Sequence, residues 1–286
     1  MANMELNEDK LVMQSVIGEI HSPQVNNPYR VTYNGELKVF PGTGGITYNK
    51  RIGDYVCGLQ ADHVEPAVTI KNSNELANGA LNTFSCVGNE ATVVTGDAKG
   101  EKGYVTGTHG GCEHVLIDFS KEIMDKMVIG DKIQIKAFGT GLEIKNIDGV
   151  KVFNIAPDLL KKINPQIEDD KIHFPVTHFI PAKIMGSGLG RDNVNRGDYD
   201  IQLFDEKVKA EYNLGTLKFG DFVAIIDADN SYGRIYKEGA ITIGVVVHSD
   251  CVISGHGPGV TTILTSPDGK ITPYLDENAN LVKYLY

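Results

Sequence analysis

The sequence Ile241-Thr-Ile-Gly-Val-Val-Val247 is a run of β-branched residues interrupted by a single glycine. Short apolar runs of this kind are typical of buried β-strands. Further runs of β-branched or aromatic residues, bounded by Gly, Pro, Asn or Asp, cover residues 36–40, 91–95, 132–138 and 222–226. Turn-forming residues between short strands indicate a β-rich fold. The chain is therefore predicted to be mainly β.

A Gly-Asp pair recurs in three similar settings, Arg51-Ile-Gly-Asp54, Val128-Ile-Gly-Asp131 and Lys218-Phe-Gly-Asp221. Glycine accepts a positive φ, and the aspartate side chain can close a turn onto nearby backbone N–H groups. Each pair would therefore lead the chain into a strand. The repeat suggests barrel-like units in both halves of the chain.

Helical patterns are few and short. Residues 120–127 and 156–163 carry helix-capping patterns, and Asn164-Pro165 then breaks the second of them. This break is the best candidate for a domain boundary. We therefore expect a β-rich α+β fold with two barrel-like β domains and few short helices, divided into residues 1–165 and 166–286.

The composition of the 286 residues restricts the partners. The chain is 41% hydrophobic and 22% charged, with a formal net charge of −10, as in soluble globular proteins. The negative charge argues against nucleic acid and against an anionic membrane surface. The N-terminal residues lack a signal-peptide pattern, and the four widely spaced cysteines form no Cys-x-x-Cys pair. We expect a cytoplasmic homo-oligomer with reduced thiols and a small-molecule ligand.

The first candidate site is the segment His109-Gly-Gly-Cys-Glu-His114. Its imidazoles could bind a metal or move protons. Alternatively, Cys112 could be a nucleophile activated by His109 or His114. A third interpretation is a tight glycine turn with a buried cysteine and histidines that cap backbone groups. The residue types favour a site only in combination.

The second candidate site follows the strand predicted at residues 241–247, at His248-Ser-Asp-Cys-Val-Ile-Ser-Gly-His256-Gly-Pro-Gly259. His248 and Asp250 would share one face if the strand continued, because side chains alternate along a strand. His248, Asp250 and His256 are the predicted metal ligands, with Zn, Fe or Mn as the expected divalent ion. An ordinary Gly-Pro loop with hydrogen-bonded histidines is the alternative.

Two polar segments are candidates for substrate binding. One follows the strand at residues 222–226, and the other is the glycine turn Gly186-Ser-Gly-Leu-Gly190 with the residues after it. Polar residues at strand ends and backbone N–H groups in glycine turns often contact ligands. The sequence contains no nucleotide-cofactor motif. The predicted substrate-binding residues are Gly188, Arg191, Asn193, Asp227, Asp229 and Asn230.

Three segments, Thr108–His114, Ile184–Gly190 and His248–Gly259, resemble the prokaryotic domain-of-unknown-function family 4438. The resemblance covers nearly the whole chain from about Ser15, and it implies an N-terminal and a C-terminal domain without an assigned activity. A weaker likeness at His109-Gly-Gly111 is to the acetamidase/formamidase family. Cys112 and His114 depart from that family's pattern, so the likeness favours only hydrolysis as a reaction class.

These features lead to two hypotheses. The first is an enzyme whose two histidine-rich segments meet between the domains and hydrolyse a small polar metabolite, with a carbon–nitrogen bond as the expected target. In this hypothesis His109, Cys112, His114, His248, Asp250 and His256 are the catalytic residues, through either a metal-bound water or Cys/His chemistry. The second hypothesis is a non-catalytic protein that binds a small ligand or serves assembly. The sequence alone does not decide between them.

Overall fold

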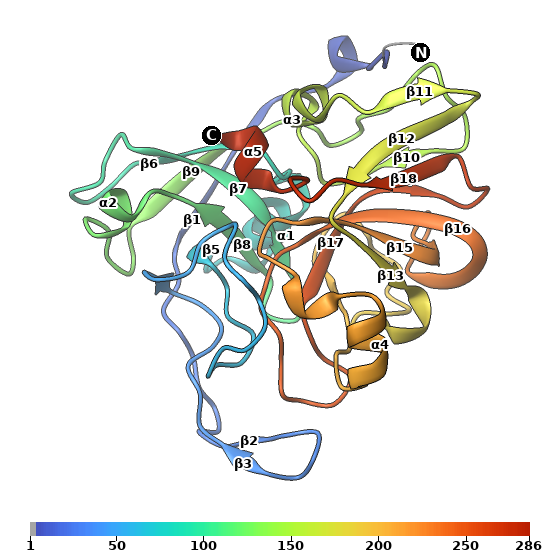
Figure 1. Ribbon diagram of the computed structural model, residues 1–286. Coiled ribbons are helices and arrows are strands. Elements are labelled where there is room, and N and C mark those ends of the chain that lie inside the picture. The colour runs from blue at the N-terminus through green and yellow to red at the C-terminus, as the bar shows by residue number, and fades with distance from the viewer. Residues whose placement is uncertain (1–3) are drawn as a thin grey trace.

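The computed structural model describes residues 4–286, and the fold is mainly β with few short helices, as predicted (Figure 1). The helices are α1 (Glu75–Phe84), α2 (Lys121–Met124), α3 (Pro157–Ile163), α4 (Glu206–Glu211) and α5 (Leu281–Leu285), with 3₁₀ turns η1 (Glu8–Lys10), η2 (Ala182–Ile184) and η3 (Leu214–Thr216). Within these residues no helix is long and apolar enough to cross a bilayer.

The strands of the first half form a closed barrel. They are β1 (Gln14–Ile20), β4 (Ile46–Thr47), β5 (Ala67–Lys71), β6 (Glu90–Val93), β7 (Lys102–His109), β8 (His114–Asp118) and β9 (Lys132–Ala137). Six of them pair in the order β1-β9-β6-β7-β8-β5, and β5 pairs back to β1 through Ile20 and Ile70. Along β9 exposed and buried residues alternate, as the sequence predicted. The buried side chains fill the barrel.

The second sheet is built around the strand that contains most of the run predicted at residues 241–247. It contains β10 (Lys151–Val152), β13 (His178–Pro181), β14 (Tyr199–Asp200), β15 (Phe222–Asp229), β16 (Ile235–Val246) and β17 (Gly259–Ser266). Its order is β10-β17-β16-β15-β13, with β14 paired to β17. Every residue of β17 is buried, and the Thr261 hydroxyl donates to the Thr108 carbonyl on β7. The barrel and the second sheet therefore meet at β7 and β17.

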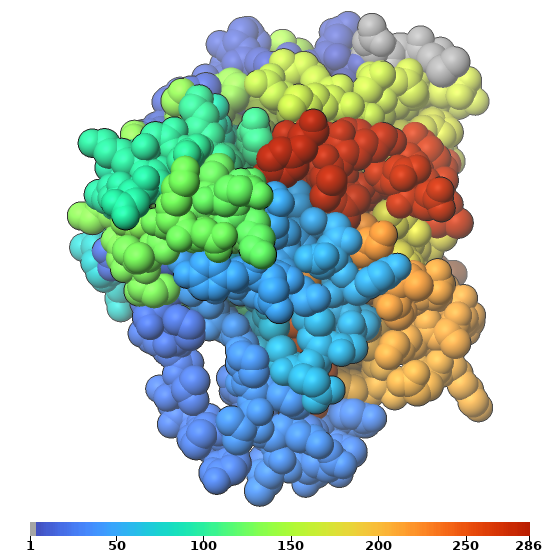
Figure 2. Space-filling view, turned by 60° about the vertical axis from the view of Figure 1, so that its left-hand side comes forward, coloured from blue at the N-terminus to red at the C-terminus, as the bar shows by residue number. Residues whose placement is uncertain are grey.

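Smaller elements complete the fold. The strands β11 (Gln166–Glu168), β12 (Lys171–Val176) and β18 (Ile271–Leu275) form a third sheet, and β2 (Arg30–Val31) pairs with β3 (Leu37–Lys38). The β2–β3 hairpin belongs to the blue segment that projects from the body in Figure 2. Both of its strands are exposed, and only two residues of the run predicted at 36–40 are paired.

The three Gly-Asp pairs form the turns expected from the sequence. Asp54, Asp131 and Asp221 each accept a hydrogen bond from the backbone N–H three residues earlier, at 2.8, 3.0 and 2.8 Å. The glycine before each aspartate has a positive φ, between +83° and +93°. Each aspartate side chain therefore replaces a backbone acceptor and fixes the approach to the next segment.

Candidate functional site

The first histidine-rich segment is a β-hairpin end. His109 ends β7 and His114 begins β8, and the two residues face each other across the ladder. Gly111 and Glu113 have φ values of +79° and +56°, so the chain reverses tightly, as the paired glycines suggested. Both imidazoles contact the carboxylate of Glu65.

The second segment is the loop between β16 and β17. His248 is completely buried, and its Nδ1 lies 2.9 Å from the Ser249 carbonyl. The strand ends at Val246, so the alternation expected to place Asp250 beside His248 does not apply. The Asp250 carboxylate instead accepts the Cys251 N–H at 2.8 Å. The structure therefore puts Asp250 outside the group that surrounds His248.

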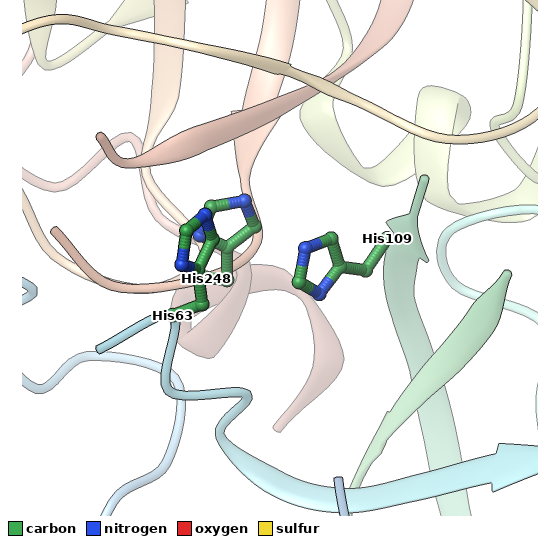
Figure 3. Close-up of side chains that lie close together, drawn as sticks. All are labelled: His63, His109 and His248. Atoms are coloured by element: carbon green, nitrogen blue, oxygen red, sulfur yellow. The ribbon is translucent and has the colours of Figure 1, made fainter. Parts of the chain in front are cut away.

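The two histidine-rich segments meet. The ring centroids of His109 and His248 are 4.2 Å apart, and both residues join His63 in a group that could hold a metal ion, with ligand atoms within 4.8 Å of one another. Figure 3 shows the His109 ring pointing from the end of β7 toward His63 and His248, which project from loops. A cavity of about 170 Å³ beside them is lined by His63, His109 and His256 among others.

Five acidic or imidazole residues of this region were missed in the sequence analysis: Asp62, His63, Glu65, Asp198 and Asp200. The first three lie in the segment before β5, and the two aspartates flank Tyr199 at β14. Two patterns could have identified them. One is the density of titratable residues in Asp62-His-Val-Glu65, and the other is the i, i+2 spacing of Asp198 and Asp200.

Three imidazoles are anchored through the same ring nitrogen. His109 Nδ1 lies 2.5 Å from Glu65 Oε1, and His63 Nδ1 lies 3.3 Å from Asp62 Oδ2. His248 Nδ1 faces a backbone carbonyl, as described above. Because carboxylate and carbonyl oxygens accept hydrogen bonds, each Nδ1 donates, and Nε2 is the ring nitrogen left to bind a metal once it carries no proton. Metal-binding histidines are usually oriented in this way.

His248 and Asp198 form a close contact that lacks hydrogen-bond geometry. His248 Nε2 lies 2.7 Å from Asp198 Oδ2, yet among residues 4–286 neither atom has a hydrogen-bond partner, although both are buried. Buried polar atoms are normally paired. The distance is that of an ion pair between a protonated imidazole and a carboxylate, and an ion that replaced the proton would take both atoms as ligands at a separation of about 3.0–3.4 Å.

Gly259 leaves the space that this contact needs. A Cβ atom at position 259 would lie 1.9 Å from Asp198 Oδ2 and 2.2 Å from His248 Nε2. Asp200, which pairs with Gly259 across β14 and β17, directs its Oδ1 to within 3.5 Å of His248 Nε2. Its Oδ2 lies 3.1 Å from His256 Nδ1. The strand pairing therefore brings both aspartates to the histidines.

The site holds ionised carboxylates. Burial opposes ionisation of Asp200 and Glu65, but hydrogen bonds and charge from the neighbouring imidazoles hold the pKa of each carboxyl well below its usual range. Burial also disfavours charge on His248, but the carboxylates of Asp198 and Asp200 raise its pKa well above the ordinary value. The concentration of negative charge favours a bound cation.

Cys112 and His114 lie behind His109. Glu65 Oε1 is 3.0 Å from His114 Nδ1 and 3.6 Å from Cys112 Sγ. Burial and the Glu65 charge raise the pKa of the Cys112 thiol far above its ordinary value. The neutral thiol is a poor nucleophile, so this geometry favours a supporting role for both residues.

The predicted substrate-binding residues fall into two groups. Gly188 and Arg191 line the cavity. The other four are outside the set of cavity-lining residues. Asn193 and Asp229 each accept the backbone N–H two residues later, which stabilises turns because short polar side chains replace backbone acceptors there. Asp227 accepts the Gly239 N–H across the β15–β16 hairpin, and Asn230 donates to Tyr199 and Thr262, which are distant in the sequence.

Comparison with known proteins agrees with the predicted resemblance. Residues 29–161 match the family described as domain of unknown function (DUF4438), N-terminal, and residues 162–285 match its C-terminal counterpart. A solved structure titled "Crystal structure of TM1086" has 48% sequence identity and a TM-score of 0.95, with both chains covered over their full length. No curated protein matches the chain.

Proposed function

We propose that this chain, which belongs to the DUF4438 family, is a metal-dependent hydrolase of a small polar substrate. The observation that carries the proposal is the convergence of His63, His109 and His248. Each has its Nδ1 held by an acceptor, so Nε2 is the nitrogen left to bind an ion in place of a proton. Imidazole groups oriented by carboxylates are the usual first ligands of catalytic transition metals.

The donor set indicates the class of metal. Imidazole nitrogens with the carboxylates of Asp198 and Asp200 suit Zn²⁺, Fe²⁺ or Mn²⁺, whereas Ca²⁺ and Mg²⁺ prefer oxygen ligands alone. The unpaired atoms of His248 and Asp198 support the same conclusion, because an ion would satisfy both. When bound, such an ion lowers the pKa of a coordinated water and supplies a nucleophile at neutral pH.

The size of the cavity suits a small molecule as the substrate. Its volume of about 170 Å³ is below the range of roughly 300–1,000 Å³ that is typical of pockets for drug-sized ligands. His256 lies at the cavity with a side chain 35% exposed, and Asp200 orients it. His256 therefore presents an oriented imidazole to the cavity. Arg191 at the cavity wall is paired with Glu113 at 3.6 Å, and a carbon–nitrogen bond remains our expected target.

Elemental analysis of untagged protein purified without chelator tests the proposal. We expect Zn, Fe or Mn in the wild type and its loss in His109→Ala and in His248→Ala. A matched control is His178→Asn, because His178 is a buried imidazole of β13 whose nitrogens face the hydroxyls of Thr177 and Thr216. The control should keep the metal.

The activity is then tested with metal-loaded protein and a panel of small amides, ureas and cyclic amides. Turnover that disappears on chelation and returns with the metal would support the proposal. A folded wild type that takes up no transition metal would refute it. Metal binding without turnover would instead favour the non-catalytic binding protein.

A further inference from the structure

We propose that the cluster holds two metal ions, bridged by the Asp200 carboxylate. This inference rests on the proposed function, because it divides the ligands of the same site between two positions. Three of the potential metal-binding groups overlap in this region, and each of His63, His248 and Asp200 belongs to two of the three. One imidazole nitrogen binds one ion, so the distances between the donor atoms decide the division.

The first position lies between His248, Asp198 and Asp200, a group whose ligand atoms are within 4.8 Å of one another, and His109 faces it from the end of β7. The two imidazole rings are 4.2 Å apart at their centroids, and the unpaired atoms His248 Nε2 and Asp198 Oδ2 are 2.7 Å apart. The side chains of His248 and Asp198 are 0% and 4% exposed. This position is therefore dry, and a cation is the partner that would satisfy both atoms without a proton.

The second position lies between His63, His256 and Asp200. His63 Nε2 is 3.2 Å from His256 Nδ1, and Asp200 Oδ2 is 3.1 Å from His256 Nδ1 and 3.8 Å from His63 Nε2. Ligands with bonds of about 2.1 Å to one ion are separated by about 3.0–3.4 Å in octahedral or tetrahedral geometry. The three donor atoms form a triangle of nearly this size.

Asp200 faces the two positions with different oxygens. Its Oδ1 is 3.5 Å from His248 Nε2, whereas its Oδ2 faces His256 and His63. A carboxylate that directs one oxygen at each of two histidine groups is arranged to bridge two ions. Paired ions in hydrolytic sites are typically about 3.5–4 Å apart and can share a bridging nucleophile.

The charge of the region favours bound cations. The carboxylates of Asp62, Glu65, Asp198 and Asp200 are all buried, and the half-exposed Arg30 lies 3.4 Å from Asp62. The buried guanidinium of Arg234 donates to the Asp198 carbonyl at 2.6 Å, so four carboxylates face two guanidinium groups. A buried excess of negative charge is costly, so divalent cations stabilise the site.

The test is a titration of chelator-treated protein with Co²⁺ alone, followed by its electron paramagnetic resonance signal. We expect two Co²⁺ per wild-type chain and a signal that weakens as the second ion couples to the first through Asp200. The partly exposed His256 can be removed without a large cavity, and His256→Ala should bind one Co²⁺ with an uncoupled signal. His178→Asn should bind two.

The possible outcomes separate this inference from the proposed function. One Co²⁺ per wild-type chain, unchanged in His256→Ala, would overturn the second ion and leave the metal-dependent hydrolase standing. No Co²⁺ in folded wild type would overturn both. Two Co²⁺ without spin coupling, with both retained in Asp200→Asn, would overturn the bridging role of Asp200.

Discussion

Two buried carboxylate regions lie on either side of His109, and they differ in how their hydrogen bonds are used. Around Glu65, the two oxygens contact His109 and His114, the Thr69 hydroxyl and the Gly44 N–H. Around Asp198, one oxygen accepts the Gly110 N–H at 2.8 Å, whereas the other is unpaired. Both regions are equally dry, so solvent does not explain the difference.

The difference distinguishes supporting groups from ligand groups. A carboxylate whose lone pairs are all used, as in Glu65, orients its neighbours, although the ligand atoms of Glu65, Cys112 and His114 also lie within 4.8 Å of one another. An unpaired buried oxygen beside an unpaired imidazole nitrogen keeps the capacity to bind an ion. His109 connects the two regions, because its Nδ1 donates to Glu65 and its Nε2 is the nitrogen that remains to bind an ion beside Asp198.

The largest effect is expected from Gly259→Ala, which fills the space on the Asp198 side. The new Cβ would lie 1.9 Å from Asp198 Oδ2 and 2.2 Å from His248 Nε2, so both side chains must move. Elemental analysis should show loss of the metal. Gly215→Ala is the matched control, because its Cβ would have its nearest neighbour at 3.6 Å. Full metal content in a folded Gly259→Ala protein would argue against ligand roles for His248 and Asp198.

A smaller effect is expected from Glu65→Gln, which alters the supporting side. The amide keeps one acceptor oxygen but directs an N–H₂ group at imidazoles that themselves donate, so His109 loses its anchor. Loss of such an outer partner typically weakens metal binding by about 10–100-fold, and breaking a buried charged contact costs about 3–5 kcal/mol. Competition with a chelator and urea unfolding would measure the two effects. Unchanged metal affinity would contradict the supporting role.

Asp221 is a third buried carboxylate, and its pKa is raised, whereas the pKa values of Glu65 and Asp198 are lowered. Burial raises the pKa of Asp221 to about 6, although Asn280 and the Lys218 N–H donate to it. A folded-state pKa above the unfolded value contributes stability that is present below about pH 4 and lost as the pH rises through about 6. The loss is up to about 3 kcal/mol.

This expectation is checked by urea unfolding of the wild type and of Asp221→Asn between about pH 4 and pH 8. The stability of the wild type relative to the variant should fall as the pH rises, since only the wild type has a carboxyl to ionise at this position. If the difference in unfolding free energy between wild type and variant stays constant across this pH range, burial does not raise the pKa of Asp221.

The sequence predicted the parts of the fold that depend on local patterns. The runs at 132–138, 222–226 and 241–247 correspond to β9, β15 and β16, because alternation and β-branching are read directly from neighbouring residues. The sequence patterns did not predict the helix α1, although Asn74 caps it by accepting the Ala77 N–H. Its interior contains Asn78 and Gly79, which disfavour helices, and packing on the barrel overrides that preference.

The candidate site was predictable only in part. The two histidine-rich segments contributed His109, His248 and His256, because imidazoles near glycine turns are visible locally. Asp198 and Asp200 come to the site through the pairing of β14 with β17. A pairing between strands that are distant in the sequence cannot be predicted from local patterns. The prediction of Asp250 as a metal ligand depends on the strand continuing to residue 250. The strand ends at Val246, so this condition is not met.

The smallest effect is expected from Cys112→Ala, which tests whether the supporting side also performs chemistry. The thiol lies 3.6 Å from Glu65 Oε1 and 3.5 Å from the His109 carbonyl, and its pKa is raised by burial and by Glu65. Alanine removes a weak donor from a carboxylate that has stronger ones, so metal content and metal-dependent turnover should both be unchanged. Alkylation of the native wild type at Cys112 should also be slow at neutral pH, because the thiolate is scarce. If Cys112→Ala kept its metal but lost turnover, the cysteine would be the nucleophile, and the division between a supporting side and a ligand side would fail at this residue.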